Sequence, residues 1–154
     1  MARKVKSIPD GYHAITPYLC INGAAAAIEF YTRAFGAAEV MRIAQPDGRV
    51  GHAEVRIGDS HVMLADEFPE MNIFGPQTLG GTSTYFLLYV EDVDAVFNRA
   101  VTAGARVDKP RQDQVYGDRN GTVVDPFGHR WTIATHIEEV SVEEMERRMH
   151  ATVK

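Results

Sequence analysis

The sequence lacks the cysteines that a disulfide framework needs. It contains one cysteine, Cys20, which cannot form a disulfide within the chain. A low cysteine content is typical of a protein in a reducing compartment, and we therefore expect a cytoplasmic location. A lone cysteine within a strand is more typical of a core or a pocket wall than of a nucleophile.

Long apolar runs and basic stripes are also absent. The longest apolar stretches are far shorter than a membrane span, and the basic residues 1–6 lead into Ser7-Ile8-Pro9-Asp10 rather than into the apolar core of a signal peptide. Lys and Arg total 16 against 21 Asp and Glu, which gives a net charge of −5. We therefore expect neither a membrane nor a nucleic acid as a partner. The 154 residues are 45% apolar and 24% charged, which predicts one globular domain over 1–154.

One pattern of elements occurs twice, at an offset of about 70 residues. In the first half, residues 15–21 predict a strand, and Asn22 and Gly36 are the predicted N-cap and stop of the helix that follows. The apolar face of that helix carries Ala24, Ala27, Ile28, Tyr31 and Phe35. Three further strands are predicted over 38–44, 52–57 and 61–65.

The second half repeats this order. Residues 85–90 predict a strand, and Asp92 and Gly104 are the predicted N-cap and stop of the next helix. Its apolar face carries Val93, Val96, Phe97 and Ala100. Three strands follow, over 105–108, 120–124 and 129–134. The repeat predicts an α+β fold of two βαβββ modules, 13–66 and 83–136.

Two segments lie outside the modules. Residues 67–82 are rich in Pro and Gly and predict either a crossing linker or a flap over a site. Ser141 and Glu144 have the spacing of a capping box, which predicts a short helix over 141–150. On that helix, Glu143 with Arg147 and Glu144 with Arg148 have the spacing of surface ion pairs.

Alternation along the predicted strands divides their side chains between two faces. Apolar residues such as Ile15, Leu19 and Ile21 suit the helix side. The residues assigned to the opposite, concave face include Thr16, Tyr18, Cys20, His52, Glu54, Arg56, Tyr85, Leu87, Tyr89, Arg130, Thr132 and Ala134. The pattern assigns no face to Asp118, Arg119 or Asn120.

The concave face favours a small-molecule pocket, because tyrosine offers apolar contact together with one polar tip. A face buried in a dimer is the alternative. Arg130 can clamp a carboxylate or phosphate, or pair with a neighbouring acid. Asp118 and Arg119 fit either a salt bridge at a turn or a role in the pocket.

His52 and Glu54 are the candidate catalytic residues. Two residues apart in a strand, they share one face with about 7 Å between their backbones. They can act as a base with its orienting partner, as two ligands of a displaced metal site, or simply as a hydrogen-bonded pair.

Several motifs resemble those of a known superfamily. The run Phe30-Tyr31-Thr32-Arg33-Ala34-Phe35-Gly36 and the turn Asp125-Pro126-Phe127-Gly128-His129 are similar to those of the vicinal-oxygen-chelate superfamily, which contains glyoxalase I, bleomycin-resistance proteins and ring-cleaving dioxygenases. Residues 15–19, 117–121 and 134–148 resemble its PhnB-like, glyoxalase-like subgroup. The resemblance implies paired βαβββ modules forming an open curved sheet, and a homodimer.

The same resemblance bears on metal binding. In metal-dependent members the ligand positions correspond to Thr16, Leu64, Tyr85 and Thr132, and none of these is a good ligand for a divalent ion. We therefore expect no metal in the usual place and no cofactor, with a displaced divalent metal as the alternative.

Two functions stay open, and the residues leave undecided whether the protein is an enzyme. The first is a binding protein that sequesters a small organic ligand, with these candidate binding residues: Tyr18, Arg56, Tyr85, Tyr89, Asp118, Arg130 and Thr132. The second is a lyase, isomerase or dioxygenase-type enzyme that uses His52 and Glu54. A dimeric scaffold without chemistry is a third possibility.

Overall fold

The computed structural model describes residues 3–152, which divide into two compact units with the boundary between Gly81 and Thr82. The strands and helix of the first unit run in the order β1 (Tyr18–Ile21), α1 (Ala24–Phe35), β2 (Ala38–Ala44), β3 (Val50–Ile57) and β4 (Ser60–Asp66). They form a four-stranded sheet of order β1-β4-β3-β2, in which only β1 and β4 are parallel. Two short helices follow, η1 (Pro69–Met71) and α2 (Pro76–Leu79), within the segment predicted to be a linker or flap.

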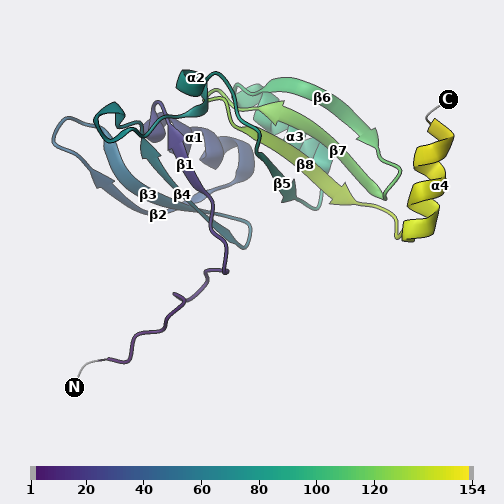
Figure 1. Ribbon diagram of the computed structural model, residues 1–154, viewed down its shortest axis with the longest axis horizontal. Helices are drawn as coiled ribbons and strands as arrows, with labels where there is room; N and C mark the ends of the chain where they lie inside the picture. The colour runs from purple at the N-terminus through teal and green to yellow at the C-terminus, as the bar shows by residue number, and fades with distance from the viewer. Residues whose placement is uncertain (1–2, 153–154) are drawn as a thin grey trace. The chain divides into compact units, whose positions relative to one another are not determined.

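The second unit repeats this arrangement. Its elements are β5 (Tyr85–Tyr89), α3 (Val93–Ala103), β6 (Arg106–Asp113), β7 (Asp118–Val124), β8 (Arg130–His136) and α4 (Val142–Thr152) (Figure 1). The sheet order is β5-β8-β7-β6, again with one parallel pair, β5 and β8. The prediction of two βαβββ modules is confirmed. No helix within residues 3–152 has the length and apolar character needed to cross a bilayer.

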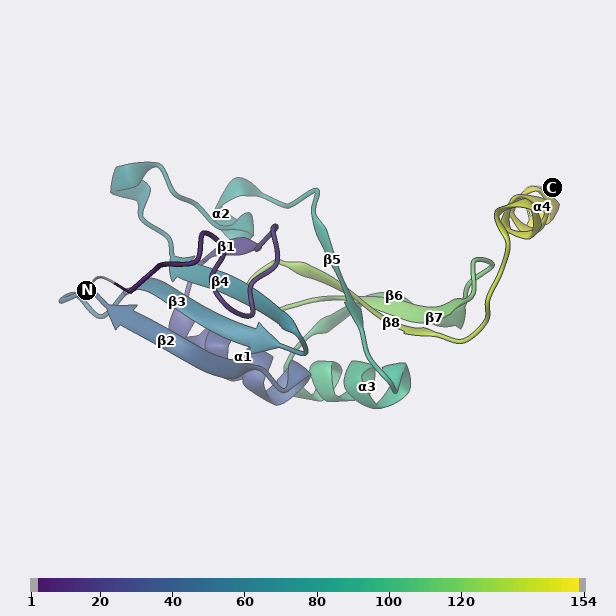
Figure 2. The same ribbon diagram turned by 90° about the horizontal axis from the view of Figure 1, so that it is seen from below.

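In each unit one helix covers one face of the sheet (Figure 2). The apolar faces predicted for the two helices are buried: every member of the α1 set and of the α3 set lies in the core. The opposing strand residues Ala53, Val55 and Ile57 are buried as well. Burial of these side chains is the main favourable term in the folding of each module.

The first strand is shorter than predicted. It begins at Tyr18 rather than at residue 15, and Ile15 is 87% exposed instead of packing under the helix. The reason is local: Pro17 has no backbone N–H to donate to a sheet.

The sixth strand is longer than predicted. It continues through Pro110 to Asp113. A proline within a strand is tolerated there because β6 is the edge strand of its sheet.

The N-cap of α1 is not Asn22, as the sequence suggested, but Gly23, which has no side chain to accept a hydrogen bond. The carboxylate of Asp66, at the end of β4, takes the role of the N-cap side chain. Its Oδ1 accepts hydrogen bonds from the backbone N–H groups of Gly23 and Ala24, each at 2.9 Å, and its Oδ2 accepts one from Val50 at 2.7 Å. One side chain therefore joins three elements. In the second unit, by contrast, Asp92 caps α3 as predicted.

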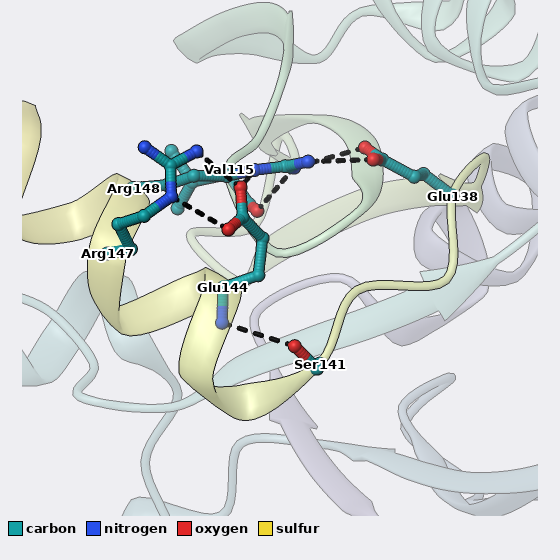
Figure 3. A network of polar contacts seen from close by, with 6 residues as sticks. All are labelled: Val115, Glu138, Ser141, Glu144, Arg147 and Arg148. Carbon is teal, nitrogen blue, oxygen red and sulfur yellow. Dashed lines mark hydrogen bonds and ion pairs between the residues drawn. The ribbon is translucent and has the colours of Figure 1, made fainter.

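Helix α4 is fastened to the second unit by arginine contacts (Figure 3). Ser141 Oγ accepts from the Glu144 backbone N–H, so the predicted cap is confirmed. Arg148 contacts both carboxylate oxygens of Glu138, donates to the backbone carbonyl of Val115 and pairs with Glu144 as predicted. The expected pairing of Glu143 with Arg147 is wrong, because Arg147 contacts Glu144 one turn away.

The end of β8 is joined to the start of β7 by a buried carboxylate. Asp118 is 3% exposed, and its Oδ1 lies 2.8 Å from Nδ1 of His136. The other ring nitrogen of His136 lies 3.2 Å from Glu139. The hydrogen bond with Asp118, and then the contact with Glu139, raise the pKa of His136 above its usual value of 6.5.

Replacing Asp66 with Ala should destabilise the protein by about 1.5–3 kcal/mol, because three backbone N–H groups lose a charged acceptor. Asp59→Ala is the matched control, since Asp59 lies in an exposed turn and, among residues 3–152, its side chain accepts a hydrogen bond only from its neighbour Ser60. Urea unfolding followed by circular dichroism measures both. If Asp66→Ala lowered the free energy of unfolding no more than the control does, the joining role of Asp66 would be contradicted.

The His136–Asp118 contact should stabilise the protein in a pH-dependent way. Because the folded-state pKa of His136 is raised, its contribution is fully present below about pH 6.5 and is lost as the pH rises through the folded-state pKa. The melting temperature of the unaltered protein should exceed that of His136→Asn most at low pH, and the difference should shrink with rising pH. His13→Asn, at an exposed histidine, should show no such trend. A difference that is constant or grows with pH would show that protonated His136 is not stabilising.

Candidate functional site

The side chains opposite the helix in each unit form what we call its helix-free face. In the first unit this face carries Tyr18 from β1, His52 and Glu54 from β3, and Met63 from β4. Tyr18 is 50% exposed, and the other three are half-buried. The predicted placement of Tyr18, His52 and Glu54 on one face follows from the burial of their strand neighbours against α1.

Tyr18, His52 and Glu54 form a continuous row. The phenol oxygen of Tyr18 lies 2.8 Å from Nδ1 of His52, and Nε2 of His52 lies 3.5 Å from a carboxylate oxygen of Glu54. If Nδ1 accepts the phenol hydrogen, Nε2 carries its own hydrogen toward Glu54. Burial, followed by the nearby Cys20 and Glu54, raises the pKa of Tyr18, so its phenol stays protonated and is suited to donating a hydrogen bond.

The row continues into the N-terminal segment, which lies on the helix-free face (Figure 2). Burial and a hydrogen bond to Glu54 raise the pKa of Tyr12. The Tyr12 ring also stacks on His61, with 4.0 Å between ring centroids. Sequence analysis did not identify Tyr12 as a site residue, because it precedes the repeat and belongs to no periodic pattern.

A cavity lies next to each end of this row. The first, the arm-side cavity, has a volume of about 600 Å³ and lies between the N-terminal segment and the sheet. The sheet contributes Glu54 and Met63, and the segment contributes Ile8, Pro9 and Tyr12. Its walls are mainly apolar, with the carboxylate of Glu54 as a charged group.

The second, the loop-side cavity, has a volume of about 610 Å³. Tyr18, Cys20 and Ala65 line it from the sheet, and residues 68–73 close it from the segment after β4. Arg49 holds part of this wall: its guanidinium lies 4.2 Å from the Phe68 ring centroid and 2.8 Å from Glu70. Four residues of the segment predicted to be a linker or flap thus line this cavity.

Two polar residues of the first unit take no part in the row. Arg56 is exposed, forms no ion pair with any side chain of residues 3–152, and lines neither of the two cavities described above. Cys20 is half-buried in the wall of the loop-side cavity. Burial, and then Glu67, raise the pKa of its thiol, which disfavours the thiolate that a nucleophile needs.

In the second unit, two of the predicted binding residues, Tyr89 and Asp118, contact each other. Tyr89 donates to Oδ2 of Asp118 at 2.8 Å, and His136 contacts Oδ1 of the same group. The hydrogen bond to Asp118 raises the pKa of Tyr89. Asp118 does not pair with Arg119, which points to the other face and contacts Asp94 and Asp113. The turn salt bridge considered for these residues is present for Arg119, whose pair with Asp113 joins β6 and β7 beside their turn, whereas Asp118 contacts Tyr89 and His136 instead.

Another predicted pair meets at the opposite end of β5. Arg130 donates to the phenol oxygen of Tyr85 at 2.8 Å, and the Lys109 ammonium lies 5.5 Å from the Tyr85 ring centroid. Between the two ends, Thr132 shares a 2.8 Å hydrogen bond with Thr122. The helix-free face of this unit is thus a polar row with a carboxylate at one end and cations at the other.

Sequence analysis missed His136, Lys109 and Thr122, and left Asn120 unassigned. For Thr122 and Asn120 the cause lies in β7, which is almost wholly buried on both faces, so polar and apolar residues do not alternate in it. His136 and Lys109 lie just beyond the predicted ends of their strands. Asn120 belongs to the helix-free face, where it accepts from Gln114 and donates to Tyr116.

The residues at the family's metal positions do not fit a metal ion. Leu64, which corresponds to one of these positions, is 0% exposed in the core, and its neighbour Met63 lies on the helix-free face instead. Within residues 3–152, no three His, Cys, Asp or Glu side chains are grouped so that they could hold a metal. Threonine, methionine and neutral tyrosine are poor ligands for a divalent ion such as Zn²⁺.

The chain is similar to proteins of two mycobacteria. It is 45% identical over 139 residues to the uncharacterized protein Mb0911c of Mycobacterium bovis, covering 88% of this chain and 91% of that protein. It has the same identity to the uncharacterized protein Rv0887c of Mycobacterium tuberculosis, covering 82% of that protein.

Solved structures share the fold. TioX from Micromonospora sp. ML1 superposes with a TM-score of 0.64 at 28% identity, covering 81% of this chain and 99% of TioX. The Arabidopsis thaliana gene product At5g48480 gives 0.65 at 28% identity, with 80% and 98% covered. The PhnB protein from Bacillus cereus gives 0.63 at 21% identity, with 80% and 99% covered, which agrees with the PhnB-like fold expected from the sequence motifs.

The family model for the Glyoxalase/Bleomycin resistance protein/Dioxygenase superfamily matches residues 12–133, a range that contains the first βαβββ module and all but the last three residues of the second. The match confirms the resemblance that the sequence motifs indicated. Since it extends over most of the chain and agrees with the fold, the chain belongs to the glyoxalase/bleomycin resistance protein/dioxygenase superfamily.

Proposed function

We propose that the protein binds a small organic ligand on the helix-free face of its first unit. The observation that carries the proposal is the row Tyr18–His52–Glu54 with a cavity of about 600 Å³ next to each end. Cavities of this size fall within the range of about 300–1,000 Å³ that is typical of ligand pockets. Apolar walls with a few polar groups suit a ligand with an aromatic or aliphatic body and one or two hydrogen-bonding groups.

Binding fits the row better than catalysis does. A general base needs a pKa near the working pH, whereas the raised pKa of Tyr18 keeps its phenol protonated. Both nitrogens of His52 already face side chains of the row. These groups are suited to holding a ligand in one orientation by hydrogen bonds.

A metal-free enzyme is the second candidate. The close approach of Nε2 of His52 to Glu54 is the arrangement of a base with an orienting carboxylate. A ligand that displaced the Tyr18 phenol from Nδ1 would leave that nitrogen able to accept a proton. The two candidates differ in whether the ligand leaves the protein chemically unchanged.

Tyr18→Phe should weaken ligand binding roughly tenfold, because the loss of one hydrogen-bonding hydroxyl in a half-buried site costs about 1–1.5 kcal/mol. Ligands would first be found by thermal shift with a panel of small aromatic and heteroaromatic compounds, and their affinities then measured by calorimetry. Tyr116→Phe is the matched control, since it removes a hydroxyl that accepts a hydrogen bond from Asn120 in the second unit. Equal weakening by both variants would contradict a site at Tyr18.

Recovery of the bound compound, followed by mass spectrometry, separates the two candidates. The binding proposal predicts an unchanged compound, whereas conversion that is lost in His52→Asn would establish the enzyme. Metal analysis of the purified protein adds an independent check. A metal at near-unit stoichiometry that raises the melting temperature would contradict the proposal.

A further inference from the structure

Cations without a carboxylate partner gather on the helix-free face of the second unit. Within residues 3–152, neither Arg130 on β8 nor Lys109 on β6 forms an ion pair, and the same holds for Arg106. The strand register brings these residues to one region: Arg106 and Arg130 both lie opposite Val124, and Lys109 lies opposite Thr122, two residues away on the same face.

This arrangement differs from that of three other arginines in the same unit. Arg111 and Arg119 both contact Asp94, and Arg148 contacts Glu138 and Glu144. The protein has more acidic than basic residues, 21 against 16. Within residues 3–152, Arg130, Lys109 and Arg106 therefore lack the carboxylate partners that Arg111, Arg119 and Arg148 have.

Tyr85 connects two of these cations. Its ring centroid lies 5.4 Å from the Arg130 guanidinium carbon and 5.5 Å from the Lys109 ammonium, within the range of a cation–π contact. Its phenol oxygen accepts from Arg130, so the phenol hydrogen can be donated elsewhere. At 44% exposure, Tyr85 can be reached from solvent.

We propose that Arg130, Lys109 and Tyr85 form a binding site for the carboxylate or phosphate group of a small molecule. The remaining guanidinium N–H groups of Arg130 can donate to two oxygens of such a group. Lys109 supplies a second positive charge on a long flexible side chain, and the Tyr85 hydroxyl supplies a further donor. The site goes beyond the function proposed above, since it lies wholly in the second unit and needs neither cavity of the first.

The net charge of −5 does not prevent an anion from binding here. At physiological ionic strength, charges more than about 8 Å apart in solvent are largely screened. An anion at the Tyr85 ring would therefore respond chiefly to Arg130 and Lys109, both close to that ring. The contact with Tyr85 also holds the guanidinium in place before binding, which lowers the entropy cost of ordering it.

The test is a titration of the full chain with inorganic phosphate and, separately, with acetate, at constant ionic strength maintained with chloride. Nuclear magnetic resonance would follow the Arg130 side-chain Nε–Hε signal and the backbone amides of β5, β6 and β8. We expect saturable shifts confined to these residues with at least one of the two anions. The anion that binds more tightly identifies which oxyanion the site prefers.

Variants distinguish a built site from general charge attraction. Arg130→Gln should weaken binding about tenfold and Lys109→Gln about threefold, in line with the loss of one charge-assisted contact. Arg33→Gln, which removes the same charge from an exposed position on α1, should leave the affinity within about twofold. Because Lys109 is exposed, its variant keeps the test valid even if Arg130→Gln is destabilised.

Two results would overturn the proposal: no saturable shift at these residues with either anion, or equal weakening by Arg33→Gln and the two site variants. Either result would leave the first unit's ligand site untouched, because that site is tested separately with Tyr18→Phe. Conversely, the experiments could show no Tyr18-dependent ligand binding while phosphate or acetate still binds. That result would support the anion site alone.

Discussion

Each unit depends on one geometric constraint, the packing of a single helix against one face of a four-stranded sheet. Successive side chains of a strand point to opposite faces. When an apolar side chain packs against the helix, the residues before and after it in the strand therefore lie on the other face. In β3, the burial of Ala53 and Val55 against α1 thus brings His52 and Glu54 together on the helix-free face. The candidate site is a direct consequence of how the core is packed.

A second shared feature is the polar joint between the last strand of each module and the start of its helix. Asp66 at the end of β4 accepts from the first N–H groups of α1. At the corresponding place in β8, Thr135 accepts from the N–H of Val93 and donates to the carbonyl of Val90. The side chains differ, but both satisfy backbone groups that a helix start would otherwise leave unpaired.

The two helix-free faces have diverged within this common frame. The first unit offers cavities and a row of groups suited to hydrogen bonding, and the second offers a buried carboxylate at one end and unpaired cations at the other. Each feature follows from a few side chains on equivalent strands rather than from a change of fold. A few side chains can therefore give the same fold two chemically different faces. The homodimer and the cytoplasmic location stay predictions.

The sequence by itself determined the two modules, the apolar faces of α1 and α3, and the shared face of Tyr18, His52 and Glu54, because local periodicity encodes all of these. Only the tertiary structure decided which residues meet across strands. The contacts of Tyr85 with Arg130 and of Tyr89 with Asp118 join positions 45 and 29 residues apart, so they depend on strand register rather than on local pattern. The tertiary structure also decided which face each side chain of β7 occupies. A strand buried on both sides has no alternation of polar and apolar residues from which its faces could be predicted.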